Sequence, residues 1–179
     1  WLAGRTPVKV TPEANAFQVT GGLFDLRQWN PEDQPLLTMN GDWEIFTDQL
    51  LTPAELSAMP SRQEVQTILL PAEIMAGESH AGLASNGYAT LRTRVLLPED
   101  ERIYGLKFVY FGSAYRVWVN GKELVSAGTP VTNAADCRPR YLPSELLFHH
   151  LDGEVEVVVQ TAPAVRVALG EEFGMPPGS

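Results

Sequence analysis

The segment GSAYRVWVNGKEL, residues 112–124, predicts two β-strands joined by a tight turn. Asn120 and Gly121 accept positive φ angles readily, and Asn-Gly between two alternating runs is the strongest short-range signal for a hairpin. Successive side chains of a strand point to opposite faces. One face of the first strand carries Tyr115, Val117 and Val119, and the other carries Arg116 and Trp118.

The face with Arg116 and Trp118 has two interpretations. A Trp beside an Arg offers a flat apolar surface next to hydrogen-bond donors, which suits a sugar. The same pattern suits a sheet that is buried on both faces, with the Arg side chain reaching outward to water. We favour burial, since Trp is highly buried on average.

Most of the remaining periodic segments also alternate like strands. We expect strands or extended segments at residues 22–29, 36–39, 42–47, 66–70, 88–97, 103–111, 154–161 and 165–169. Within residues 42–47 we expect Trp43 to lie in the core. Thr52, Pro53 and Glu55 form a helix-start signal with a capping box, which predicts one short helix at residues 53–58. The long connections at 72–87 and 127–144 suit Greek-key crossings, so we predict an all-β jelly-roll sandwich.

Length and composition predict one domain of ordinary globular type. With 179 residues the chain can bury a full core. We predict a leader or stalk at 1–20, the jelly roll at 21–169, and a tail or linker at 170–179. No apolar run approaches the roughly 20 residues of a membrane span. Because the chain begins with Trp1 instead of Met, we expect it to be part of a longer protein.

The charge pattern limits the partners. The formal net charge of -9 argues against nucleic-acid binding. Residues 86–122 nevertheless carry six basic and three acidic residues. This local excess fits either cross-strand charge pairing or a site for a polar or anionic ligand. Cys137 is the single cysteine, so no internal disulfide forms, which still permits an extracytoplasmic location.

Several motifs follow the order of a known family. They are NGDWE (40–44), LP (70–71), GYATLR (87–92), LLP (96–98), VWVNG (117–121) and EVEVVVQ (154–160). This series resembles the sugar-binding jelly-roll domain that precedes the barrel in bacterial β-galactosidases and β-glucuronidases. The resemblance implies a galactose-binding-like fold.

Two further segments, GGLFDLR (21–27) with Trp29 and GSAYRVW (112–118), resemble a second group more closely. These are extracytoplasmic sensing domains of bacterial seven-transmembrane receptors with diverse intracellular signalling modules. The resemblance covers about residues 21–162. It implies a sensor joined to a membrane region of the same polypeptide, with a histidine-kinase or cyclase output. The chain departs from the expected polar, basic stretch at residues 162–165, which read APAV.

The sequence contains no strong motif for catalysis or for binding a metal or a cofactor. We therefore predict a non-catalytic domain that holds neither a metal nor a cofactor. Ser79-His80 lacks the strained turn of a catalytic serine. His149-His150 would point to opposite faces of a strand and could not chelate together. The carboxylates of Asp25, Glu32 and Asp33 keep a calcium site in a loop as an open alternative.

We therefore predict a non-catalytic, extracytoplasmic ligand-sensing domain tethered to the membrane, with a small-molecule or carbohydrate ligand. The alternative is an accessory carbohydrate-binding domain of a glycoside hydrolase. The candidate ligand-binding residues are Arg92, Arg94, Arg116 and Trp118 on the sheet and His80, Asn86 and Tyr88 from the 72–88 loop. The competing interpretation pairs the arginines with strand carboxylates such as Glu154 and Glu156. In a sensor, we expect the mobile parts to be the two long connections and the two ends of the chain.

Overall fold

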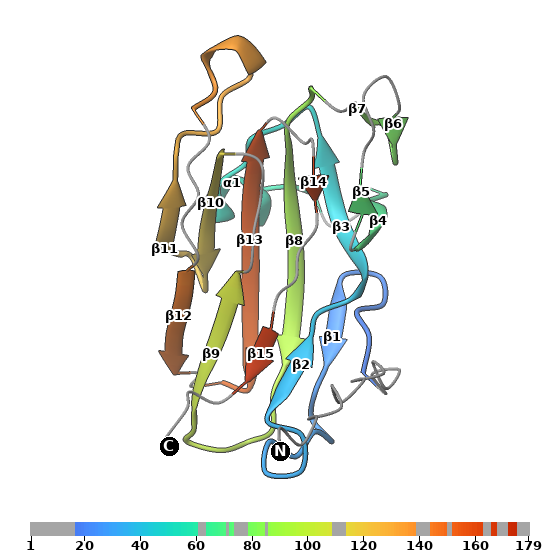
Figure 1. The fold of residues 1–179 in the computed structure, drawn as a ribbon. Helices are drawn as coiled ribbons and strands as arrows, with labels where there is room; N and C mark the ends of the chain where they lie inside the picture. Colours follow the sequence, from blue (N-terminus) through green and yellow to red (C-terminus); the bar gives the residue numbers. More distant parts are fainter. Residues whose placement is uncertain are drawn as a thin grey trace, which may run out of the picture.

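Two β-sheets lie face to face in the computed structural model (Figure 1). The structure describes residues 17–60, 64–70, 72–73, 79–84, 86–108, 114–138, 144–149, 152–162, 166–167 and 172–174. The larger sheet has the strand order β11-β10-β13-β8-β3-β4, with β1 also paired to β8. Its strands are β1 (Leu23–Asp25), β3 (Gly41–Thr47), β4 (Gln66–Leu70), β8 (Ala89–Leu96), β10 (Ala114–Val119), β11 (Lys122–Ala127) and β13 (Glu154–Ala162).

The smaller sheet has the order β12-β9-β15-β2. It consists of β2 (Leu36–Thr38), β9 (Ile103–Phe108), β12 (Ser144–His149) and β15 (Glu172–Gly174). Two short pairs stand apart: β5 (Ala72–Glu73) with β14 (Arg166–Val167), and β6 (Ser79–His80) with β7 (Leu83–Ala84). The predicted all-β sandwich is confirmed, with β1 and β8 forming a parallel pair within it.

The core lies between the sheets and uses the alternation of each strand. Trp43, Val117 and Val157 point inward from the larger sheet, and Tyr104 and Leu106 meet them from β9. Trp43 is fully buried, as expected, and its indole N–H donates to the Met39 carbonyl at 3.0 Å.

The hairpin and the helix form as the sequence predicts. Asn120 and Gly121 have φ angles of 47° and 77°, so the β10–β11 turn has the two positive values of a type I′ turn. Helix α1 (Pro53–Ser57) begins at Thr52 with a complete capping box: Thr52 accepts from the Glu55 N–H, and the Glu55 carboxylate accepts from the Thr52 N–H.

Two strands of the smaller sheet were not predicted. Strand β12 contains three consecutive apolar residues, 146–148, which break the alternation. Strand β15 has only three residues and pairs with both β9 and β2, inside the segment predicted as a tail or linker. At the other end, Val19 of the predicted leader is buried and bridges to Gly41. Residues 1–16 and 175–179 lie outside the described residues.

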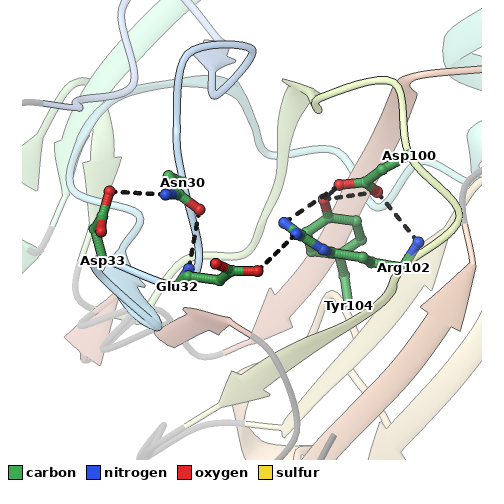
Figure 2. Close-up of polar contacts among 6 residues, drawn as sticks. All are labelled: Asn30, Glu32, Asp33, Asp100, Arg102 and Tyr104. Atoms are coloured by element: carbon green, nitrogen blue, oxygen red, sulfur yellow. Dashed lines mark hydrogen bonds and ion pairs between the residues drawn. The ribbon is translucent and has the colours of Figure 1, made fainter.

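A polar network fastens the β1–β2 connection to β9 (Figure 2). Tyr104 donates to both Asp100 carboxylate oxygens, at 3.0 and 2.9 Å, and Arg102 contacts Asp100 and Glu32 at 3.6 and 3.4 Å. Burial and the Asp100 carboxylate raise the pKa of Tyr104 well above its usual value. Within the β1–β2 connection itself, the Asn30 side chain donates to the Asp33 carboxylate and accepts from the Glu32 N–H.

Within the described part of the chain, no three His, Cys, Asp or Glu residues are grouped as they would be to hold a metal ion. None of the helices in that part is long and apolar enough to cross a membrane.

Candidate functional site

The four sheet residues predicted for the site all point to the outer face of the larger sheet, away from the core. Strand pairing aligns them in rows: Trp118 lies opposite Val158, and Val158 opposite Arg92. Arg92 in turn lies opposite Glu44 of β3. Alternation along each strand then places Arg94 and Arg116 on the same face.

Helix α1 crosses this outer face. Phe46, Leu56, Trp118 and Val158 form a small apolar cluster beneath it, which we call the outer cluster. Leu51, Met59 and Val65 pack around its edge. Trp118 is only 6% exposed, so the buried interpretation of this residue is confirmed. Its ring is covered and does not form an open stacking surface.

Arg92 is held in place by its neighbours. Its Nε donates to Glu44 Oε2 at 2.5 Å, and the two side chains are only 19% and 15% exposed. The guanidinium carbon also lies 5.6 Å from the centre of the Phe46 ring. Gly22, with a φ of 78°, backs the carboxylate: a Cβ at this position would lie 2.5 Å from Glu44 Cγ. The fixed ion pair leaves little freedom to either side chain.

Arg94 is freer than Arg92. It is half exposed, and its ion partner Glu154 lies 3.8 Å away and is equally exposed. The predicted alternative of arginines paired with strand carboxylates is thus present at Arg94. It is present at Arg92 as well, where the partner is Glu44 of β3 and not one of the two glutamates on β13.

Two pockets flank α1. The first has a volume of about 510 Å³, and we call it the arginine pocket. Its sheet side is formed by Glu44, Phe46, Arg92 and Arg94, and its helix side by Leu56, Ser57, Met59, Pro60 and Val65. The second, the tryptophan pocket, measures about 480 Å³. It is lined by Trp118, Asn120, Gly121 and Glu156 from the sheet and by Thr52, Pro53, Ala54 and Ser57 from α1 and its cap.

Glu156 is the carboxylate of the tryptophan pocket. Its burial raises the pKa, while Arg92 and Arg94 oppose this shift and Glu44 and Glu154 reinforce it. The backbone at this point is fixed by the hairpin: the Glu156 N–H donates to Asn120 Oδ1 at 2.8 Å, and the Asn120 N–H donates to the Glu156 carbonyl at 2.9 Å.

The other predicted site residues lie elsewhere. Asn86 is exposed and lines neither pocket, and Tyr88 packs against the small cluster of Ala114, Cys137 and Ala162. Arg116 also lies outside both linings, and its buried Nε has no hydrogen-bond partner among the described residues. The His80 side chain lies outside the described residues; its backbone belongs to β6.

The sequence analysis missed Glu44, Phe46 and Glu156 as pocket residues. A signal was available, because Glu44 and Phe46 alternate with the core residue Trp43. Once β3 pairs with β8, these side chains must share the face of Arg92.

The fold and its outer-face pockets define a β-sandwich domain with two candidate ligand sites. No protein-family model matches this chain, and no curated protein matches it. Several solved structures with a similar fold are enzymes. A β-glucuronidase from Faecalibacterium prausnitzii is 18% identical, with a TM-score of 0.48 over 71% of this chain. A β-glucuronidase from Bifidobacterium dentium, complexed with coumarin-3-O-glucuronide, is 17% identical, with a TM-score of 0.49 over 79%.

A third similar structure is a GH2 β-galacturonidase from Eisenbergiella tayi bound to galacturonate, which is 12% identical with a TM-score of 0.45 over 79% of this chain. The chain covers only 21%, 30% and 25% of these three enzymes, in the order given. Similarity at this level transfers no activity, ligand or site to the chain.

Proposed function

We propose that this chain is a non-catalytic binding domain whose arginine pocket holds a small acidic carbohydrate, such as a uronic acid. The single observation behind the proposal is the pocket of about 510 Å³ that joins Arg92, Arg94 and the Phe46 ring. A sugar acid needs donors for its carboxylate and hydroxyls and an apolar surface for its ring.

The two arginines are suited to different tasks. Arg92 is fixed by Glu44 and Phe46 and is pre-organised to donate its remaining N–H groups. Arg94 has a half-exposed guanidinium with a long contact to Glu154, so a ligand carboxylate can replace that contact with a bidentate pair. Leu56, Met59 and Val65 supply the apolar wall opposite the sheet.

The carboxylates favour binding over catalysis. Glycoside cleavage uses two carboxyl groups on either side of one bond. Among the described residues, the arginine pocket has one carboxylate, Glu44, and the tryptophan pocket has one, Glu156. Glu44 is also committed to Arg92.

Two biological contexts fit such a domain. We place the accessory carbohydrate-binding domain of a larger glycoside hydrolase first, because the proposed ligand is a sugar. The extracytoplasmic sensing role rests on the sequence resemblance alone and stays a prediction. The coding region after residue 179 separates them: a barrel with two catalytic acids supports the first, and hydrophobic spans followed by a kinase or cyclase region support the second.

Isothermal titration calorimetry against neutral sugars and uronic acids tests the ligand class. We expect glucuronate and galacturonate to bind better than glucose and galactose. Arg94→Gln should weaken uronate binding at least tenfold. The matched control is Arg27→Gln, because Arg27 is exposed, paired with its neighbour Asp25 and outside both pocket linings. Absence of any uronate binding, or equal losses in both variants, would contradict the proposal.

A further inference from the structure

We infer that the tryptophan pocket is a second, separate binding site, which takes a small polar ligand carrying a protonated amine. The inference concerns Trp118, Asn120 and Glu156 and does not depend on the ligand of the arginine pocket. The two pockets lie on opposite sides of α1 and share only Ser57 in their linings.

The charge of the lining selects a cation. Glu156 is the only charged side chain among the residues that line this pocket in the described part of the chain. Arg94 lies directly opposite Glu156 on β8, but Arg94 and Arg92 both line the arginine pocket and not this one. A half-buried carboxylate has already lost part of its hydration in the folded protein. Pairing it with an ammonium group therefore costs less further desolvation than pairing an exposed carboxylate would.

The direction of the Glu156 side chain is set by the hairpin. Asn120 exchanges two hydrogen bonds with the Glu156 backbone, through its own N–H and through Oδ1. Strand alternation then points the carboxylate to the outer face, beside the row that contains Trp118 and Val158. The backbone that carries the acid is therefore held in place, so binding need not order that backbone.

Trp118 supplies an apolar contact beside the Glu156 carboxylate, because it lines the same pocket. Most of its ring is covered in the outer cluster, so the small exposed part meets the C–H groups of a ligand and the carboxylate alone meets the ammonium. Ser57 lines the same pocket, and its hydroxyl can accept another N–H of the ammonium, whereas Asn120 Oδ1 already accepts the Glu156 N–H.

Glucosamine is the probe, with glucose and N-acetylglucosamine as uncharged controls of the same ring. Binding is followed by calorimetry and by the NMR signal of the Trp118 indole N–H, which Trp118→Phe assigns. We expect glucosamine to bind and to shift this signal, and both controls to bind at least tenfold more weakly. Equal binding of the three sugars, or no response to glucosamine up to tens of millimolar, would overturn the inference.

Glu156 and Glu154 make a matched pair of variants on β13. Glu156→Gln should weaken glucosamine binding at least tenfold, whereas Glu154→Gln should change it less than twofold, since Glu154 lies outside the lining. Glu156→Asp keeps the charge and should retain part of the affinity, which also guards against a loss caused by misfolding. Equal losses in the 154 and 156 variants would mean that only the overall charge matters, and the site would be rejected.

The pH dependence gives a further check. Glu156 faces Arg92, Arg94, Glu44 and Glu154, and its burial raises the pKa of its carboxyl. Glucosamine binding should therefore fall on acidification at a higher pH than an ordinary Glu would give. A pH-independent affinity down to pH 4 would contradict a role for the carboxylate.

Discussion

The two faces of the larger sheet differ in how they are covered, although the same strands form both. On β13, Val157 points to the core and Val158 points outward, and both are almost fully buried. The inner face is covered by a second sheet. The outer face is covered by α1, which also leaves charged side chains such as Arg92 and Glu156 on either side.

The dimensions explain this difference. A five-residue helix is only ~7.5 Å long, whereas six strands spaced ~4.8 Å apart span about 24 Å. Helix α1 can bury one apolar cluster but cannot close the whole face. The uncovered flanks become the two pockets, so the short helix both stabilises the outer face and creates the candidate sites.

The largest expected effect separates two of the buried tryptophans, Trp43 on the inner face of the larger sheet and Trp118 on its outer face. Trp43→Ala should cost about 3–5 kcal/mol of unfolding free energy, because it leaves a cavity in a core enclosed by two sheets. Trp118→Ala should cost about 2 kcal/mol, since α1 can move into the space. Urea unfolding measures both. Equal losses would show that the outer cluster is packed as rigidly as the core.

The next effect concerns the ion pair beneath the arginine pocket. Glu44→Gln leaves the largely buried Arg92 guanidinium without its counter-charge and should cost about 1–3 kcal/mol. Replacing both partners, in the double variant Glu44→Leu with Arg92→Met, should recover most of this loss. A double variant no more stable than Glu44→Gln would show that the charges stabilise the face beyond their mutual pairing.

Alternation allowed the longer strands to be predicted closely. Strand β4 occupies residues 66–70 as predicted. The observed limits of β8 and β13 differ from the predicted ones by no more than one residue at either end. The failures have physical causes. Strand β15 is too short to show a period, and the parallel contact of β1 with β8 depends on residues about seventy positions apart.

The site was predicted only as far as local periodicity reaches. Alternation placed Arg92, Arg94 and Trp118 on strand faces, and the structure brings those faces together. The partner of Arg92 could not be found this way, because the choice between Glu44 and the β13 carboxylates depends on strand order. The cover over Trp118 depends on where α1 docks, and the capping box specifies only where that helix begins.

A smaller effect tests whether the start of α1 matters for the outer face. Thr52→Ala removes the capping hydroxyl and should cost about 1 kcal/mol. It should also weaken ligand binding on both sides of the helix, because α1 forms a wall of each pocket. Thr67→Ala, at an exposed position of β4, serves as the control and should cost less than ~0.5 kcal/mol. Unchanged unfolding and binding in Thr52→Ala would show that α1 is held by the outer cluster alone.

The smallest effect is a pH-dependent gain at Glu156. Burial raises the pKa of this carboxyl in the folded state, so ionisation costs more in the folded chain than in the unfolded one. This penalty is absent below the ordinary Glu pKa and grows as the pH rises through the raised folded value. Glu156→Gln, which cannot ionise, should therefore be slightly more stable than the parent at neutral pH and equal to it near pH 3.

Glu154→Gln loses a carboxylate paired with Arg94 and should show no gain. Urea unfolding of the three proteins between pH 3 and 8 measures the difference, and a gain that appears on acidification instead would reverse the assigned cause. Because the same substitution should weaken amine binding, a gain in stability with a loss of affinity would mark Glu156 as kept for its ligand and not for the fold.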